Sequence, residues 1–410
     1  MNPCSGICSP EPRLSATPPN LQLSKTFDSS GRRGSNPRPE PWQGSALPTA
    51  LRPHFQSHHL MQLRGKIYRK EAGAPTLGCF AKVTSPGMER FWMSGRLAEN
   101  LVEIRHDISA LNEPGFWAVL GTFEGEWILA RFNNVRDADF PETYSTFKTD
   151  NWSSSLSKEE YCDYVEKIRS QIAIGDFYQV NACRILTSSL IQGSTIESLF
   201  NRILKVNPAP FAAYLKIPDL EIASASPERF LSISNGTLLT SPIKGTSASG
   251  EFPEKDKAEN LMIVDLMRND LSQISIPGSV TTPRLLGTEE HPGLFHLVSD
   301  IQGKIRDDLS FAEAITRLMP PGSVSGAPKS SAVRMIAEHE SKRGPYCGIL
   351  GWAENGRAEL SVGIRMFWKI EQSIKFGTGA GITWSSNAES EWEETQLKAR
   401  KLISLVDISS

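Results

Sequence analysis

Two pairs of acidic residues repeat one spacing at the start of two predicted helices. Asp256 and Glu259 lie three residues apart in KDKAENLMIVDLMRND, and Glu391 and Glu394 repeat this spacing in SEWEETQLKARKL. Side chains three apart share one helix face, so like charges there disfavour the helix, and no run of bases in either first turn offsets this. Brought together, the four carboxylates would suit Mg²⁺, which prefers oxygen ligands. Acids near helix N-termini also complement the helix dipole, and spacing alone leaves both interpretations open.

A glutamate and a lysine flank a predicted β-hairpin. Glu228 in SASPERF precedes the first strand, and Lys244 in PIKGT follows the second. Asn235-Gly236 between the strands is typical of a tight turn, which would return both ends of the hairpin to one neighbourhood. An acid beside a lysine is an ordinary salt bridge in most proteins and a proton-transfer pair in a few, and both interpretations stay open here.

Two glycine-rich segments have only a superficial likeness to nucleotide-binding loops. GTGAG (377–381) continues as ITW, whereas a dinucleotide fingerprint continues as a helix. PGSVSGAPKS (321–330) has the wrong spacing for a phosphate loop, and Pro328 lacks the N–H that such a loop donates. We therefore expect no nicotinamide cofactor, and we expect the bare backbone of GTGAG to approach an anion closely.

Composition excludes several classes of protein. The chain has 410 residues, a formal net charge of −2 and 39% hydrophobic residues. This charge argues against a nucleic-acid partner, and no stretch approaches the roughly 18 consecutive apolar residues of a membrane span. The six cysteines form no C-x-x-C pair and no secretory signal is recognisable, so we expect a cytoplasmic location.

The first 62 residues differ in composition from the rest. Residues 1–60 hold ten of the 27 prolines and nine serines, without apolar periodicity. We expect residues 1–62 to be disordered or a wrongly assigned start, with Met61 as one alternative initiator. A transit peptide is the other interpretation, because the segment is basic and poor in acids. Residues 63–410 are predicted to form the catalytic domain.

Patterns after residue 63 predict an α+β fold. GFWAVLGTF and EWILARF form one hairpin around Glu124-Gly125, and Asn355-Gly356 and Glu371-Gln372 connect the strands of a predicted three-stranded meander over 347–384. Capping boxes at Ser157–Glu160 and Ser310–Glu313 start two helices, and further helices are predicted near Pro328 and from about 389 to 406. Hairpins with intervening helices favour a sandwich over a doubly wound parallel sheet.

A series of longer motifs resembles the chorismate-utilising enzyme family. In order these are SASPERF, PIKGT, AENLMIVDLMRNDL, HLVSDI, PPGSVSGAPK, CGILGW, IRMF, GTGAGI and ESEWEETQLKA, spanning about residues 155–405. The family includes anthranilate synthase large subunits, aminodeoxychorismate synthase component I, and isochorismate and salicylate synthases. The resemblance implies a four-layer α/β/β/α sandwich of two large antiparallel sheets with helices outside.

The resemblance also implies roles for individual residues. Glu259 and Glu394 are similar to the Mg²⁺-binding glutamates, with Asp256 and Glu391 in support. Arg365 is similar to the residue that binds the enolpyruvyl carboxylate of chorismate. The further residues to which the resemblance gives substrate contacts are Thr246, His296 facing the ring and leaving hydroxyl, the backbone of Gly379, Ala380 and Gly381, and Trp352 where a tyrosine is common.

PIKGT resembles the aminodeoxychorismate synthase branch, in which Lys244 would attack the ring and Glu228 would help the hydroxyl leave. Gln179 stands where isochorismate and salicylate synthases have a lysine base, which disfavours water chemistry. The chain shows no glutamine amidotransferase cysteine, so a separate glutaminase subunit is expected to supply ammonia, and a separate lyase to make 4-aminobenzoate. The alternatives are an anthranilate synthase large subunit and a non-catalytic chorismate-binding protein.

Overall fold

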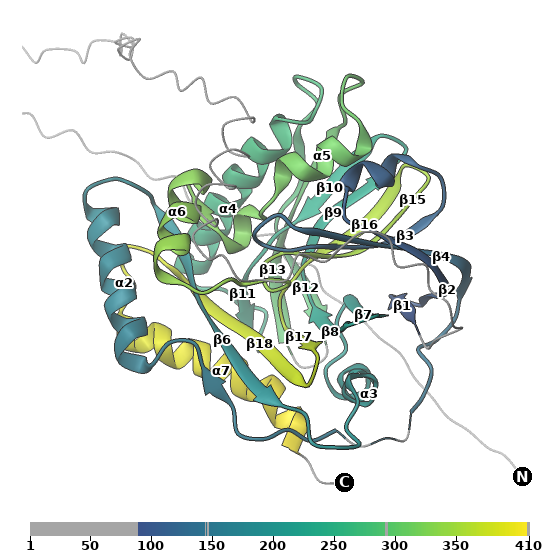
Figure 1. Cartoon of the computed structure of the whole chain (residues 1–410). Helices are drawn as coiled ribbons and strands as arrows, with labels where there is room; N and C mark the ends of the chain where they lie inside the picture. Colours follow the sequence, from purple (N-terminus) through teal and green to yellow (C-terminus); the bar gives the residue numbers. More distant parts are fainter. Residues whose placement is uncertain (1–88, 144, 146, 292–293, 408–410) are drawn as a thin grey trace, which may run out of the picture. The chain divides into compact units, whose positions relative to one another are not determined.

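The computed structural model describes residues 89–407 except 144, 146 and 292–293 (Figure 1). The predicted leader, residues 1–62, lies outside the described residues. None of the helices in the described part is long and apolar enough to cross a membrane.

The strands are joined by antiparallel pairing into one continuous sheet, which folds into two halves described here as the first and the second sheet. The first sheet runs β6 (Gln179–Ser189), β18 (Ser373–Ile382), β17 (Met366–Ile370), β8 (Leu220–Ser226), β7 (Phe211–Ile217) and β1 (Arg90–Met93), with short β5 (Ser153–Ser154) and β14 (Gly326–Ala327) beside β6. The second sheet runs β2 (Arg96–Arg105), β4 (Trp127–Asp137), β3 (Phe116–Gly121), β15 (Ile349–Glu354), β16 (Arg357–Val362), β9 (Arg229–Ser234), β10 (Thr237–Ser241) and β13 (Leu294–Lys304), with β11 (Ile243–Ser247) and β12 (Thr281–His291) both paired to β13.

The two sheets meet at β2. The first residues of β2, Arg96 to Glu99, pair with β1, and the whole strand also pairs with β4. Asn100 has a φ of +61°, and the register against β4 shifts between Leu101 and Glu103. A bulge of this kind bends a strand and increases its twist. The predicted pair of antiparallel sheets is confirmed, and the pairing of β1 with β2 connects the two sheets.

Two apolar cores lie on opposite faces of the first sheet. Phe91 and Met93 of β1 belong to the core between the sheets, whereas Trp92 between them packs on the outer face with Phe200 of α3. This alternation is the period of two expected of a strand covered on both faces. Figure 1 shows α2 and α7 beside β6 and β18, and α3 against β7 and β8.

The predicted helix starts are confirmed. Ser157 accepts from the backbone N–H of Glu160 while the Glu160 carboxylate accepts from that of Ser157, and Ser310 and Glu313 repeat this exchange. Such caps satisfy N–H groups that lack partners inside the helix. The helices are α2 (Lys158–Ala173), α3 (Ile196–Val206), α4 (Glu254–Ser272), α5 (Phe311–Leu318), α6 (Lys329–His339) and α7 (Ala388–Asp407), with 3₁₀ turns η1 (Ile108–Asn112) and η2 (Gly322–Val324).

The predicted turns at Asn235-Gly236 and Asn355-Gly356 are confirmed, since both residues of each have positive φ. The predicted three-stranded meander is wrong. Its middle strand ends as β16 at Val362 and restarts as β17 at Met366 in the other sheet, with Arg365 at a φ of +50° between them. The segment AELSVGIRMFWKI fits one long strand or two short ones equally well, so the sequence pattern did not reveal this crossing.

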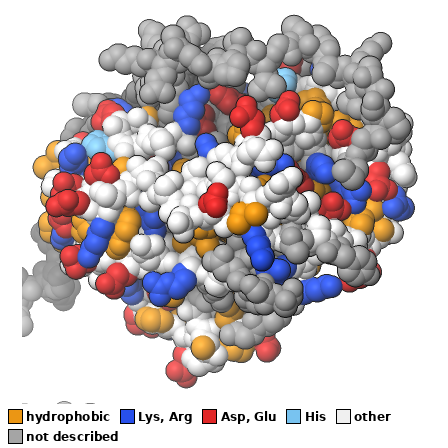
Figure 2. Space-filling model, turned by 60° about the horizontal axis from the view of Figure 1, so that its bottom comes forward, with side chains coloured by type: hydrophobic (Ala, Val, Ile, Leu, Met, Phe, Trp, Pro, Cys, Tyr) orange, Lys and Arg blue, Asp and Glu red, His pale blue; other side chains and the backbone are white. Residues whose placement is uncertain are grey.

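On the face drawn in Figure 2, acidic and basic side chains are interspersed rather than gathered by sign. This agrees with the small net charge of the chain.

Candidate active site

Lys244 lies in β11 with its amine in the protein interior. A register shift against β13 separates Ile243 from Thr246, and Gly245 between them has a φ of +91°. A methyl group added to Gly381 of β18 would lie 3.5 Å from Lys244 Nζ, so the amine faces the glycine-rich strand. Burial lowers the pKa of Lys244, and the negative charge of Glu259 opposes that shift. A lowered pKa increases the neutral, nucleophilic fraction of a lysine.

Glu228 is buried just before β9 and accepts a hydrogen bond from the side chain of Ser323. Burial raises its pKa to about 7, against the effects of that bond and of the positive charges of Lys244 and Arg365. The hairpin therefore returns its two ends to one neighbourhood, as predicted. A carboxyl group with a pKa near neutrality can both give and take a proton at physiological pH.

Arg365 lies between β16 and β17, where the chain passes from the second sheet to the first. Burial lowers its pKa, and the charge of Glu228 opposes this. His296 on β13 is 2% exposed and lies opposite Thr246 in the β11–β13 ladder. Thr246 is two residues from Lys244, so the pairing of β11 with β13 brings together residues of two motifs, PIKGT and HLVSDI.

The glycine-rich strand is extended, as expected. Gly379, Ala380 and Gly381 are opposite Cys183, Ala182 and Asn181 of β6. On its other side β18 is paired with β17 only as far as Phe376. In the described part of the chain no further strand pairs with that side beyond Phe376, and binding of an anion by the backbone N–H groups there stays a prediction.

The two acidic helix turns belong to α4 and α7, and the charges of both affect the pKa of Lys244. The charges of Glu259 and Glu394 each raise the pKa of Lys244, against the burial that lowers it. Asp256 lies under β11, with Oδ2 3.0 Å from the position of a methyl group on Gly245. Burial raises the pKa of Glu391, and the charge of Glu394 adds to this. The two turns are therefore on the same side of the molecule.

Glu259 and Glu394 each have a lysine partner within their own helix, contrary to the expectation of uncompensated charge. Lys255 lies 3.7 Å from Glu259, and Lys398 lies 2.5 Å from Glu394, both four residues apart within a helix. Lys398 also donates to the carbonyl of Gly379 at 3.1 Å, which ties α7 to the glycine-rich strand. Lys398 was missed, although the i, i+4 spacing from Glu394 was a signal that could have found it.

The carboxylates of these turns are oxygen donors of the kind that Mg²⁺ takes. Among the described residues, no group of three or more His, Cys, Asp or Glu side chains is arranged as a complete metal-ligand set. Mg²⁺ is usually bound by one or two carboxylates, with water and substrate oxygens completing the shell. Glu259 and Glu394 are the carboxylates that would hold it.

A comparison with protein families bears on this arrangement. The family model for chorismate binding enzymes matches residues 122–404, more than half of the chain. The chain belongs to the chorismate-binding enzyme family. The match covers every residue placed above in the site.

Relatives from this family carry two different names. Aminodeoxychorismate synthase component 1 of Salmonella typhimurium is 36% identical over 270 residues, which are 62% of this chain and 59% of that protein. Anthranilate synthase component 1 3 of Haloarcula marismortui is 35% identical over 271 residues, 62% of this chain and 54% of that protein. The chain thus spans less than two thirds of the length of these curated relatives. Their similar identities do not separate the two names.

Solved structures of family members share the fold. Anthranilate synthase component I from Streptococcus pneumoniae superimposes with a TM-score of 0.65 at 23% identity, covering 87% of this chain and 100% of that one. The menaquinone-specific isochorismate synthase of Escherichia coli gives 0.68 at 17% identity, covering 80% and 90%. These similarities agree with the predicted four-layer sandwich.

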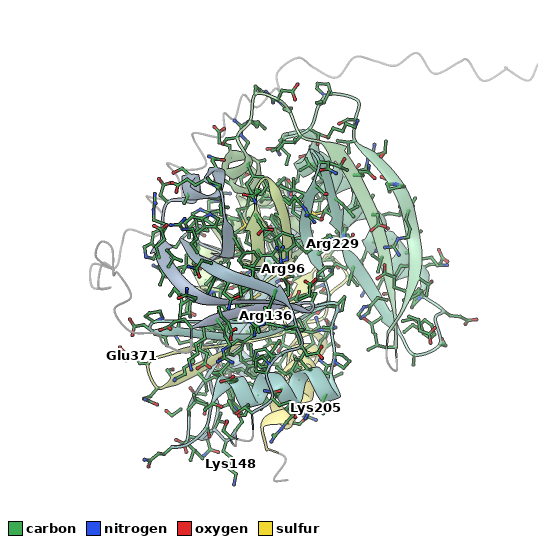
Figure 3. All side chains as sticks on the ribbon, turned by 90° about the vertical axis from the view of Figure 1, so that its right-hand side faces the viewer. Arg96, Arg136, Lys148, Lys205, Arg229 and Glu371 are labelled. Atoms are coloured by element: carbon green, nitrogen blue, oxygen red, sulfur yellow. The ribbon has the colours of Figure 1, made fainter. Side chains whose placement is uncertain are left out.

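Trp352 has its described contacts on another part of the second sheet. Its ring stacks on Phe116 with centroids 6.1 Å apart, and the guanidinium of Arg96 lies 4.5 Å from it (Figure 3 labels Arg96). Arg96 in turn pairs with Glu354 at 2.6 Å. A contact between Trp352 and substrate therefore stays a prediction.

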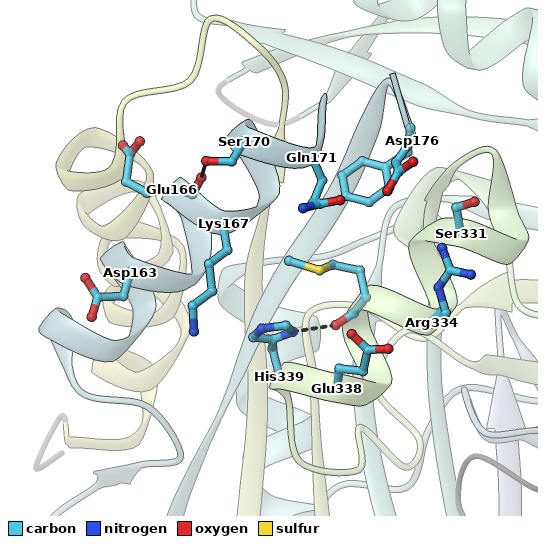
Figure 4. A pocket seen from close by; sticks show the side chains of 12 residues that line it. Asp163, Glu166, Lys167, Ser170, Gln171, Asp176, Ser331, Arg334, Glu338 and His339 are labelled. Atoms are coloured by element: carbon cyan, nitrogen blue, oxygen red, sulfur yellow. Dashed lines mark hydrogen bonds between the residues drawn. The ribbon is translucent and has the colours of Figure 1, made fainter. Parts of the chain in front are cut away.

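A groove of about 570 Å³ lies between α2 and α6, away from these residues (Figure 4). Its lining includes Lys167, Arg334 and His339, and His339 Nδ1 is 3.1 Å from the carbonyl of Met335. None of the residues predicted for chorismate binding lines it. The candidate site described above is therefore separate from this groove.

Proposed function

We propose that the chain is the chorismate-transforming component of an aminodeoxychorismate synthase, which makes 4-amino-4-deoxychorismate from chorismate and ammonia. The observation that carries this proposal is the buried amine of Lys244, close to Glu228 and facing Gly381. An anthranilate synthase needs no nucleophilic lysine at this place.

The residues present account for each proton and bond in two displacements. Neutral Lys244 forms a bond from its nitrogen to ring carbon 2, the two conjugated ring double bonds each shift by one position, and the 4-hydroxyl leaves as water with a proton from Glu228. Ammonia then bonds to carbon 4, both double bonds shift back, and the carbon 2–nitrogen bond breaks. The proton from ammonia returns to Glu228, and Lys244 regains its starting form.

Arg365 and the backbone of β18 would hold the enolpyruvyl carboxylate, because a guanidinium and open N–H groups both favour an anion. His296 and Thr246 would border the ring. Mg²⁺, held by Glu259 and Glu394 with Asp256 and Glu391 in support, would fix the ring carboxylate and withdraw charge from the ring. Replacing Glu394 with Gln is expected to abolish most activity and to shift the Mg²⁺ titration; an unchanged titration would remove Glu394 from the metal site.

Ammonia is proposed to come from a separate glutamine amidotransferase subunit. The purified chain should therefore use ammonium salts directly and use glutamine only when that partner is added. Full glutamine-dependent turnover by the single chain would contradict this division of labour.

Identification of the product tests the proposal. The chain is incubated with chorismate, Mg²⁺ and ammonium, with and without an aminodeoxychorismate lyase. We expect 4-aminobenzoate only when the lyase is present. The second candidate, an anthranilate synthase large subunit, is favoured by the names of some relatives. Direct appearance of fluorescent anthranilate without the lyase would establish that candidate instead.

A further inference from the structure

Arg184 of β6 is a buried arginine whose described bonds go to neutral groups. It is 2% exposed, and burial lowers its pKa to about 10, so it stays a cation at neutral pH. Nε donates to Thr395 Oγ1 at 3.1 Å, Nη2 to Gln396 Oε1 at 3.0 Å and Nη1 to Ser154 Oγ at 3.1 Å. Its guanidinium also lies 4.3 Å from the ring centre of Trp392.

Three of these four contacts are with one turn of α7, and that turn contains Glu394. The same turn is held from β18, because Thr378 Oγ1 donates to the carbonyl of Thr395 at 2.9 Å. Thr395 is fully buried, and its hydroxyl donates to the carbonyl of Trp392 at 2.8 Å. The inner face of this turn is therefore fixed by directional bonds from two neighbouring strands.

The rotation of α7 about its axis decides where its carboxylates lie. Residues 391, 394 and 398 share one helix face, and residues 392, 395 and 399 share the neighbouring one. Side-chain tips lie about 5–6 Å from a helix axis, so a 20° rotation would move a carboxylate by about 2 Å. Metal–oxygen distances tolerate only about 0.2 Å.

An apolar side chain would be the less costly choice in this position. Ala399 and Leu402 continue the inner face of α7 and pack in the outer core of the first sheet without any charge. A cation buried without an anionic partner is expensive, whereas apolar packing between a helix and a sheet allows small rotations. The planar guanidinium of Arg184 donates in fixed directions and therefore restrains rotation of α7, which apolar contacts would permit.

We propose that Arg184 is a positioning residue that sets the rotation of α7 and thereby directs Glu391 and Glu394 to the metal site. This inference rests on the proposed function, since it concerns the carboxylates assigned to Mg²⁺ there. Arg184 touches neither substrate nor metal in this role.

The inference is tested by measuring the affinity of the full-length protein for Mn²⁺. Electron paramagnetic resonance reports the binding directly, without an activity assay. Arg184→Lys keeps the positive charge but loses the planar guanidinium. Thr395→Val removes the hydroxyl that accepts from Arg184 Nε, with less risk to folding. Both are expected to weaken Mn²⁺ affinity about tenfold, as loss of residues that orient metal ligands does. Thr395→Ser keeps the hydroxyl and should stay within about twofold of the unaltered protein.

Arg343→Lys is the matched control, because Arg343 is equally buried, at 1% exposure, but holds Glu340 and not α7. It is expected to lower the unfolding temperature while Mn²⁺ affinity stays within about twofold. Unchanged affinity in Arg184→Lys and Thr395→Val, or an equal loss in Arg343→Lys, would overturn the role of Arg184. Equal affinity in Glu394→Gln and the unaltered protein would contradict the metal site itself, and this inference with it.

Discussion

Two clusters of buried charge in this molecule are built in opposite ways. Arg343 donates to both carboxylate oxygens of Glu340, at 2.7 and 2.8 Å, and to the carbonyls of Val324 and Asn181. In the candidate site burial lowers the pKa values of Lys244 and Arg365 and raises that of Glu228. No ion pair in the described part of the chain joins those three residues.

The difference shows how one interior can serve both stability and chemistry. A buried ion pair stabilises a fold only when its groups have good geometry and all their bonds, as around Arg343. Groups whose pKa values are shifted by burial without a closed ion pair are typical of functional sites. Glu228, with its pKa raised to about 7, can exchange a proton near neutral pH. The predictions below test whether the two clusters respond as differently as this comparison requires.

Lys244→Met should produce the largest effect. Formation of product from chorismate and ammonium is expected to fall roughly 10³-fold or more, because the nucleophile is lost. The free energy of unfolding should stay unchanged or rise by about 1 kcal/mol, because an amine buried at some cost is removed. A coupled lyase assay and urea unfolding measure both. Activity close to that of the unaltered protein would exclude an obligatory covalent lysine.

Arg343→Met should have the opposite pattern to Lys244→Met, with a large loss of stability. Removing one partner of a buried pair leaves Glu340 uncompensated, so unfolding by urea is expected to become easier by about 3–5 kcal/mol. The double variant Arg343→Met/Glu340→Leu should recover part of this loss, because neither charge then remains buried. A loss below about 1 kcal/mol in the single variant would show that the two clusters do not differ in kind.

Glu228→Gln should change the pH dependence of stability. Below pH 4.5 the carboxyl group is protonated in both the folded and the unfolded protein. Between pH 4.5 and about 7 only the unfolded protein releases the proton, so the free energy of unfolding falls by roughly 3 kcal/mol and is then level. The Gln variant should lack this fall in urea unfolding from pH 4 to 8. Parallel curves for the two proteins would contradict the raised pKa.

Gly381→Ala should have the smallest effect, confined to the candidate site. The added methyl group would lie 2.5 Å from Gln179 Nε2 and 3.5 Å from Lys244 Nζ. We expect about a tenfold loss in kcat/KM, roughly 1.4 kcal/mol, with stability nearly unchanged. Adding Gln179→Ala removes the closest contact and should restore part of the rate. No recovery in the double variant would place the cause elsewhere.

Local signals in the sequence predicted the elements of the fold well. The turns at Asn235-Gly236 and Asn355-Gly356 and the capping boxes at Ser157 and Ser310 formed as expected, because each depends on residues only a few positions apart. The split of the run 358–370 into β16 and β17 was missed. Its local pattern fits one strand, and only pairing with β9 in one sheet and β8 in the other decides where the strand breaks.

For the candidate site, motifs predicted which residues converge but not how they are held. Lys244, Glu228 and Glu394 were found from short motifs. The hydrogen bond from Ser323 to Glu228, and the bond from Lys398 to Gly379, join segments far apart in the chain. Nothing in the local sequence around either partner marks such a bond, because side-chain partners across a core depend on strand register and helix rotation.

The amino-acid sequence alone determined the turns, the helix starts and the set of reactive side chains, since those follow from backbone preferences and residue chemistry over a few positions. Only the tertiary structure decided that the two sheets form one ladder through β2, and that a lysine of β11 faces a glycine of β18. It also decided the direction in which the pKa values of these groups shift, because a pKa depends on burial and on neighbours brought from distant parts of the chain.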